Sequence, residues 1–283
     1  QWPVDLTTCN IQEELCFGQP VPNSFKGPTG APINFFRVPI YHVVGQQPFR
    51  VMLPEFMHCN GIEEKFSPER PEKKSKATLG IRMHSKPMAT EYEMKWIEKY
   101  MEVIDACKKH VVSIAAQVKQ KGLTYGELRK GFHPMTTYNL KDSDDNDVLD
   151  SEGNTIPHPS KKPWFNPVVP YKRMDNGDMI LTGKFRKFDD GVAGDMISPE
   201  ELVSVKGKSL QEFELSCSAI LDNIYIGSSN ISVRWNVLDG YVTPVNSNEY
   251  VTPPPVSRNS VKRSHVEPSE PIQPSEPIQP SQM

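Results

Sequence analysis

The sequence predicts an α+β protein in which a β-rich body carries one long amphipathic helix. Short runs of β-branched and aromatic residues, separated by Pro, Gly and Asn-Gly turns, recur through most of the 283 residues. The stretch from about 91 to 121 instead has the periodicity of a helix. From 246 to 283 the chain is rich in Pro, Ser and Gln and cannot bury a core. We therefore expect a single β-rich domain over 1–245 and a disordered tail over 246–283.

Three runs predict strands in the N-terminal third of the chain, at 34–38, 49–53 and 77–83. Prolines 39, 48 and 54 flank the first two. Because proline cannot donate to a β-ladder, we expect those two strands to be short or to lie at a sheet edge.

The helix is predicted from apolar side chains that recur every three or four residues. They are Ile97, Met101, Ile104, Cys107, Val111, Ile114 and Val118. Gly122 is a plausible stop signal. A stripe of this kind is typical of a helix packed on a sheet, so we assign it no chemistry.

An acidic insertion is predicted at about 142–154. Asp142, Asp144 and Asn146 match the first ligand positions of a calcium loop. Asp147 stands where such a loop needs glycine, and Gly153 stands where it needs a bidentate Glu. The pattern favours a solvated loop, and we expect no metal and no cofactor.

No catalytic signature is present in the sequence. Gly207-Lys208-Ser209 resembles the end of a phosphate-binding loop, but Leu202 occupies the position of its first glycine. The seven histidines are scattered, and no HExxH or GxSxG motif occurs. We therefore predict that the protein is not an enzyme.

Charge is segregated along a chain whose formal net charge is only −3. Residues 65–86 and 161–188 each hold seven Lys and Arg side chains against two acidic ones. Five cysteines without a CxxC pair fit free thiols in a reducing, intracellular compartment. No run of 18 apolar residues occurs, so we expect no membrane partner.

Aromatic rings are interleaved with cations between residues 161 and 241. In 231–237 the alternation places Trp235 on the apolar face and Arg234 on the polar face. In 184–188 neither face is cleanly apolar, so one face combines a ring with cations. Such a surface suits single-stranded nucleic acid, because cations neutralise phosphates while bases stack on rings. A solvated strand edge with charged gatekeepers fits the same pattern.

The candidate nucleic-acid-binding residues share this pattern of rings and cations on predicted strands. They are Trp164, Tyr171, Lys172, Arg173, Lys184, Phe185, Arg186, Lys187, Phe188 and Arg234.

The order of segments in this region resembles a known family. An Asn-Pro step leads into a basic segment at 165–172, a glycine-turn hairpin follows at 176–188, and two β-branched strands end in Arg-Trp within 220–237. Over about 130–245 the chain is similar to the single-stranded-DNA-binding proteins of nucleocytoplasmic large DNA viruses, including the asfarvirus and chlorella virus kind. Residues 1–60 match nothing in that pattern.

The resemblance implies an OB-like β-barrel core and sequence-tolerant binding of viral single-stranded DNA in replication, repair or packaging. It extends to Tyr171, Lys172, Arg173, Lys184, Arg186, Lys187 and Arg234. It also implies a location in the host cytoplasm, a viral factory or the virion, and DNA rather than RNA as the ligand. The sequence leaves oligomerisation open. The Pro/Ser/Gln-rich tail differs from the acidic tails of many such proteins and could hold a viral protein partner.

An alternative function is that of a virion structural or scaffold protein, whose cations and rings would contact other proteins through the body and the Pro-rich tail. Exposed rings along one basic groove would favour nucleic acid, and the discriminating rings are Phe185, Phe188, Tyr171 and Trp164. Buried rings with scattered cations would favour the structural role, and each ring that proves buried counts toward it.

Overall fold

The computed structural model describes residues 3–27, 29–67, 70–84, 88–128, 132–149, 155–156, 158, 161–175, 179–189, 191–203, 213–228 and 230–244. The predicted tail at 246–283, the tip of the acidic insertion at 150–154 and the Asn176-Gly177 turn lie outside the described residues.

The protein is mostly β-sheet with one long helix, so the α+β prediction is confirmed. The strands are β1 (Val4–Asp5), β2 (Leu15–Phe17), β3 (Val21–Lys26), β4 (Pro32–His42), β5 (Gln47–Met52), β6 (Met57–Ser67), β7 (Arg70–Arg82), β8 (Met135–Thr136), β9 (Trp164–Phe165), β10 (Tyr171–Arg173), β11 (Met179–Leu181), β12 (Lys184–Asp189), β13 (Val192–Ile197), β14 (Phe213–Ile226) and β15 (Ile231–Pro244). The helices are α1 (Ile11–Glu14) and α2 (Glu91–Ser113), and short 3-10 turns occupy Leu6–Thr8, Val44–Gln46, Tyr125–Leu128 and Pro199–Leu202.

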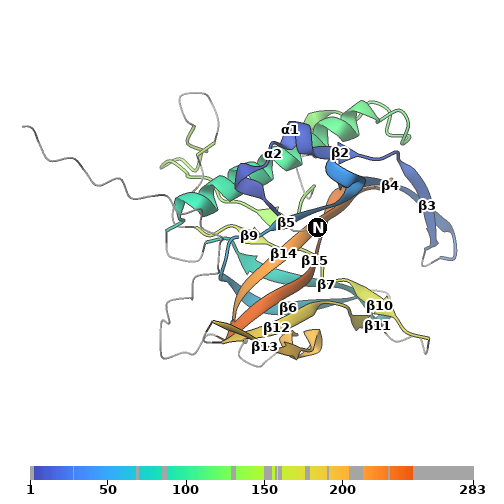
Figure 1. Cartoon of the computed structure of the whole chain (residues 1–283). Coiled ribbons are helices and arrows are strands. Elements are labelled where there is room, and N and C mark those ends of the chain that lie inside the picture. Colours follow the sequence, from blue (N-terminus) through green and yellow to red (C-terminus); the bar gives the residue numbers. More distant parts are fainter. Residues whose placement is uncertain are drawn as a thin grey trace, which may run out of the picture.

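The long strand β14 is the centre of the main sheet. It pairs antiparallel with β15, β4, β5 and β6 along different parts of its length. Beyond β6 the sheet continues through β7, β9 and β8, and beyond β15 it continues through β12 and β13. Figure 1 shows the resulting curved sheet with α2 lying along one side and the hairpin of β3 and β4 projecting from it.

A short segment at 167–169 links the two arms of this sheet. The Leu79 N–H donates to the Pro167 carbonyl and the Val168 N–H to the Trp235 carbonyl, at 3.0 and 2.8 Å. Val168 therefore forms bridges with both β7 and β15. The strands alone form no closed sheet, but hydrogen bonds connect β14, β6, β7, segment 167–169, β15 and again β14.

The hairpin of β10 and β11 interrupts the partner strand of β15. Val168 lies parallel beside Asn236, and Lys184 in β12 lies parallel beside Asp239. Segment 167–169 and β12 therefore lie one after the other along the same edge of β15, and β10 and β11 lie between them in the sequence.

The prediction that residues 34–38 form a short or edge strand is wrong, because β4 is 11 residues long and pairs with the central β14. Of residues 49–53, the first four do fall in a short strand, since β5 has six residues, but it lies inside the sheet and pairs with β1, β4 and β14. Pro39 lies opposite Asn223, the last position at which β14 pairs with β4. Its missing N–H is tolerated because β14 changes partner from β4 to β5 just beyond this point.

The helix α2 begins where the chain supplies a capping box. The Thr90 side chain accepts from the Glu93 N–H, and the Glu93 carboxylate accepts from the Thr90 N–H at 2.7 Å. The helix ends at Ser113 rather than near 121, and Lys119 has a left-handed φ of 60°. The Ser113 hydroxyl donates to the His110 carbonyl at 2.7 Å, which competes with continued helix hydrogen bonding.

The buried stripe of α2 differs from the predicted one. Trp96, Tyr100 and Cys107 are fully buried, whereas Met101 is 37% exposed. The large rings of Trp96 and Tyr100 face the sheet, and this turns Met101 outward. No helix in the described part of the chain is long and apolar enough to cross a membrane.

Four buried rings join the helix to the sheet. Trp235 lies 5.4 Å from Tyr100 and 5.8 Å from Phe165, measured between ring centroids, and Trp96 lies 6.3 Å from Phe165. Each of these side chains is 0% exposed. The prediction that Trp235 belongs to the core is confirmed, and this aromatic cluster is the main contact between α2, β9 and β15.

His133 makes the stability of this core depend on pH. It lies edge-on to Tyr100, and burial together with the charge of Lys108 lowers its pKa to about 4. Below the unfolded pKa near 6.5, the unfolded chain binds a proton that the folded chain does not. The stability is therefore present above pH 6.5 and is lost as the pH falls toward 4. We expect the free energy of unfolding to drop by about 1–2 kcal/mol between pH 7 and pH 5 from this group, as measured by urea unfolding.

The control for this pH dependence is His133→Asn, whose carbonyl oxygen can replace the ring nitrogen that accepts from the Met135 N–H. Burial also lowers the pKa of His84 and His110, so a residual slope of the same sign remains in the variant. A variant whose pH slope equals that of the natural protein would contradict the assignment to His133.

Candidate nucleic-acid interface

The outer face of β7 and β9 carries a cation and a ring side by side. In β7 the side chains of Leu79 and Ile81 enter the core, so Arg82 points the other way. In β9, Phe165 enters the core and Trp164 faces outward, directly opposite Arg82 in the ladder. Gly80 lies beneath the indole, and a Cβ there would stand 3.4 Å from the Trp164 ring, which is an ordinary van der Waals distance.

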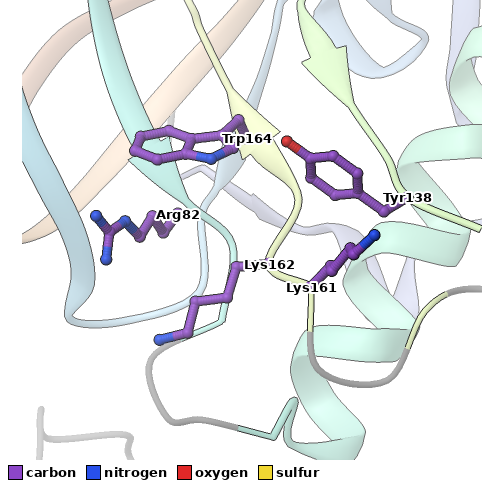
Figure 2. Close-up of a pocket in the computed structure, with 5 residues that line it drawn as sticks. All are labelled: Arg82, Tyr138, Lys161, Lys162 and Trp164. Carbon is purple, nitrogen blue, oxygen red and sulfur yellow. The ribbon is translucent and has the colours of Figure 1, made fainter.

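This pair forms one side of an open pocket of about 420 Å³, the Trp164 pocket, lined by Arg82, Tyr138, Lys161, Lys162 and Trp164. Figure 2 shows Arg82 beneath the Trp164 ring, with Lys162 extending on the same side and Lys161 directed toward Tyr138. The Arg82 guanidinium carbon lies 5.1 Å from the Trp164 ring centroid, and the Lys161 Nζ lies 5.9 Å from that of Tyr138. The pocket thus combines two rings with three cations.

The base of the acidic insertion holds Tyr138 and Lys161 in place. The Tyr138 carbonyl accepts from the His158 N–H at 2.7 Å, and the Leu140 N–H donates to the Ile156 carbonyl at 2.8 Å. The Lys161 N–H donates to Nδ1 of His158 at 3.1 Å. The insertion therefore helps to build the pocket wall.

The acidic side chains of the insertion are engaged with their own loop. Asp142 accepts from the backbone N–H groups of Asp144 and Asn146, both at 2.9 Å. Asp147 forms an ion pair with Lys141 at 2.9 Å. Within the described residues, no group of three or more His, Cys, Asp or Glu side chains is arranged to hold a metal ion.

The cations of the pocket form no ion pair. Among the described residues, Arg82, Lys161 and Lys162 have no carboxylate within ion-pair distance. Burial lowers the pKa of Lys162 and the charge of Arg82 lowers it further, while the charge of Glu93 acts in the opposite direction. Gathering like charges costs free energy, which a bound anion would recover.

One predicted binding residue is corrected by the structure. Phe185 is 0% exposed and belongs to the core, so it cannot stack on a base. Its ring folds over Gly183, where a Cβ would lie 2.3 Å from the ring. The sequence pattern at 184–188 conceals this, because the face that enters the core carries a single apolar residue.

The residues predicted in β10 lie away from the Trp164 pocket, since Figure 1 shows β10 and β11 at the opposite end of the sheet from β9. Tyr171 is half-buried, and its hydroxyl donates to the Glu64 carboxylate at 2.7 Å. Lys172 is exposed. The side chain of Arg173 lies outside the described part of the structure.

The remaining predicted residues lie on β12, at a third location apart from the Trp164 pocket and from β10. Lys184, Arg186 and Lys187 are exposed. Phe188 is half-buried between Phe56 and Tyr241, after a bulge that follows Arg186. The structure thus brings neither β10 nor β12 to the Trp164 pocket.

Arg234 is exposed on β15, as predicted, and its guanidinium carbon lies 5.0 Å from the centroid of the Tyr225 ring. Of the ten predicted residues, Trp164 and Arg234 therefore occupy the outer face around β9 and β15.

Sequence reasoning missed most of the pocket. Arg82, Lys161 and Lys162 lie within the two basic segments, and the alternation in 77–83 already places Arg82 outside the core. The missing information was the pairing of β7 with β9, which joins the two segments. No sequence signal singled out Tyr138.

All five cysteines are free thiols, and four of them are buried.

Comparisons of the chain with known protein families and with curated protein sequences find no match. The geometry of the Trp164 pocket is therefore what indicates a function.

Proposed function

We propose that the protein binds single-stranded DNA, without chemistry and with little sequence preference, through the Trp164 pocket and the face around it. The observation that carries this proposal is the pair of Arg82 and Trp164 beside two further lysines that form no ion pair among the described residues. An accessible ring offers its face to any base, and the cations neutralise the neighbouring phosphates. The role that we propose is in viral DNA replication, repair or packaging, in line with the family that the sequence resembles.

The size and chemistry of the pocket support a nucleotide as the group that enters it. At about 420 Å³ it lies within the range of small-molecule sites. The ring of Trp164 provides a stacking surface, while Lys161 and Lys162 flank it with positive charge. These are features of a stacking platform for single strands rather than of a base-specific site.

The connectivity of the sheet supports an OB-like core. An OB-fold is a five-stranded, partly open Greek-key barrel that binds oligonucleotides on the face of its second and third strands. In the hydrogen-bonded circuit, β6, β7, segment 167–169, β14 and β15 are the five segments in chain order. Arg82 lies on the second segment, and Trp164 immediately precedes the third. We propose that this circuit is the counterpart of the OB barrel, with α2 inserted between its second and third segments.

The experiment is binding of a fluorescently labelled, mixed-sequence oligonucleotide followed by anisotropy across a salt series. The variant Arg82→Gln/Lys161→Gln/Lys162→Gln removes the three pocket cations. Because each phosphate contact with a single strand contributes about 0.7 to the slope of log K against log salt, we expect the slope to fall by up to about 2.

The matched control is Lys95→Gln/Lys109→Gln/Lys121→Gln, which removes three exposed cations of α2 and the turn after it. We expect this control to keep the natural salt slope. If the natural protein shows no binding at about 50 mM salt, the proposal is wrong, and the structural or scaffold role becomes the better explanation. If the pocket variant and the control behave alike, DNA does not bind at the Trp164 pocket.

A further inference from the structure

A second group of rings and cations lies on the outer face of β4, β14 and β15, and we call it the arginine pair. The Arg37 guanidinium carbon lies 5.4 Å from the Phe35 ring centroid, and that of Arg234 lies 5.0 Å from the Tyr225 centroid. The Phe35 and Tyr225 rings are themselves 5.0 Å apart. Two guanidinium groups are therefore held by two rings that touch each other.

The sheet register brings these residues together from distant parts of the chain. Tyr225 pairs with Arg37 across β14 and β4. On the other side of β14, Asn223 pairs with Arg234 in β15. Ile224 and Val233 face the core, so Tyr225 and Arg234 must face outward.

The arginine pair concentrates positive charge without an ion pair. Both arginines are exposed, and among the described residues neither has a carboxylate within ion-pair distance. Partial burial lowers the pKa of Arg234 and the nearby charge of Arg37 lowers it further, while the charge of Asp222 acts in the opposite direction. The charge of Arg234 in turn acts on Lys76, whose pKa is lowered mainly by burial. Stacking fixes both planar groups in position, which suits them to grip phosphate oxygens.

The arginine pair and the Trp164 pocket lie on one continuous face. Trp164 pairs with Thr136 in β8. Four residues before Thr136, the Phe132 carbonyl accepts from the Val233 N–H at 2.7 Å. The segment 132–136 therefore lies between β9 and β15. Adjacent strands are about 4.8 Å apart, which separates β9 from β15 by roughly 10 Å. Trp164 and Arg234 both project from this surface.

We propose that Arg37 and Arg234 bind consecutive phosphates of the strand whose base occupies the Trp164 pocket. This inference rests on the proposed function and adds a second contact point with a defined spacing. The separation between Trp164 and Arg234 is roughly 10–15 Å, and because an extended single strand advances at least the 3.4 Å per phosphate of a duplex strand, it corresponds to at most about three to five nucleotides. An oligonucleotide shorter than this reaches one of the two sites, and a longer one reaches both. The expected footprint lies at the lower end of the range of about 4–16 nucleotides found for single OB-folds.

The test compares the natural protein with Arg37→Gln/Arg234→Gln, using oligothymidines of about three and about ten nucleotides. With the longer oligonucleotide we expect the salt slope to fall by about 1.4, from two lost phosphate contacts. We also expect the gain in affinity between the short and the long oligonucleotide to shrink markedly in the variant. The control is Lys95→Gln/Lys121→Gln, which removes the same charge elsewhere and should retain both the slope and the gain.

A charge-preserving variant, Arg37→Lys/Arg234→Lys, separates charge from geometry. It should recover most of the salt slope but not the full affinity, because lysine lacks the stacked planar fork. Thermal unfolding of each variant checks that the fold is retained, and the single variant Arg37→Gln replaces the double variant if it is not.

The outcomes separate the two proposals. If the natural protein binds and the pocket variant weakens binding, while Arg37→Gln/Arg234→Gln behaves like its control, the arginine pair is not a phosphate site and the proposed function stands. If the natural protein binds neither oligonucleotide, both proposals fall.

Discussion

Replacing Trp235 by alanine is expected to lower the free energy of unfolding by about 3–5 kcal/mol. The indole is fully buried and contacts Tyr100 on α2 and Phe165 on β9. Its removal leaves a cavity at the junction of helix and sheet, which neighbours held by separate backbones cannot fill by collapse. Urea unfolding followed by circular dichroism measures the change.

The control for this prediction is Trp235→Phe, which keeps a ring in the cluster. Within the described residues the Trp235 Nε1 has no hydrogen-bond partner, so the smaller ring loses packing but no hydrogen bond. We expect phenylalanine to cost less than half as much as alanine. A loss below about 1 kcal/mol for alanine would show that this aromatic cluster does not hold α2 on the sheet.

Replacing Trp164 by alanine is expected to weaken oligonucleotide binding by about tenfold to a hundredfold. A base stacked on an aromatic side chain contributes about 1–3 kcal/mol, and Arg82 also loses the ring that positions it. Trp164 is half-buried and lies outside the core, so the unfolding free energy should change far less than for Trp235. Anisotropy at fixed salt measures the affinity.

The matched variant is Trp164→Phe, which retains a stacking face and should keep most of the affinity. Intrinsic fluorescence provides a second measurement, because Trp96 and Trp235 are buried and a bound base would contact Trp164. The fourth tryptophan, Trp2, lies outside the described residues, and its emission is the same in Trp164→Phe. We expect oligonucleotides to quench the natural protein and to quench Trp164→Phe much less. Equal affinity of the alanine variant and the natural protein would remove Trp164 from the binding site.

Local patterns predicted several features of the fold. The alternation in 231–237 correctly placed Trp235 inside and Arg234 outside, because a strand with one buried face must alternate. Periodicity identified α2, but it placed Met101 in the buried stripe instead of Tyr100. The two large rings of Trp96 and Tyr100 determine which side of α2 faces the sheet, because they bury more area than the smaller residues beside them.

Other features depend on contacts that a local pattern does not contain. Phe185 enters the core because Gly183 leaves room for its ring and β12 lies against β15. Arg82 meets Trp164 because β7 pairs with β9. Composition identified the two basic segments, but sheet register decides which of their side chains share a surface. The sequence therefore predicted that the protein has a surface of rings and cations, but it did not predict which residues form the pocket.

The central position of β14 has a consequence for how the chain folds. Arg37 lies near the start of the described chain and pairs with Tyr225 near its end, and Cys59 likewise pairs with Phe213. Such pairings close very long loops. The chain must lose the conformational entropy of these loops before the strand contacts stabilise it, so we expect slow folding. On the ribosome, β4, β5 and β6 emerge long before their shared partner is made. Their unpaired edges would then be open to other chains, so a chaperone would matter most during synthesis.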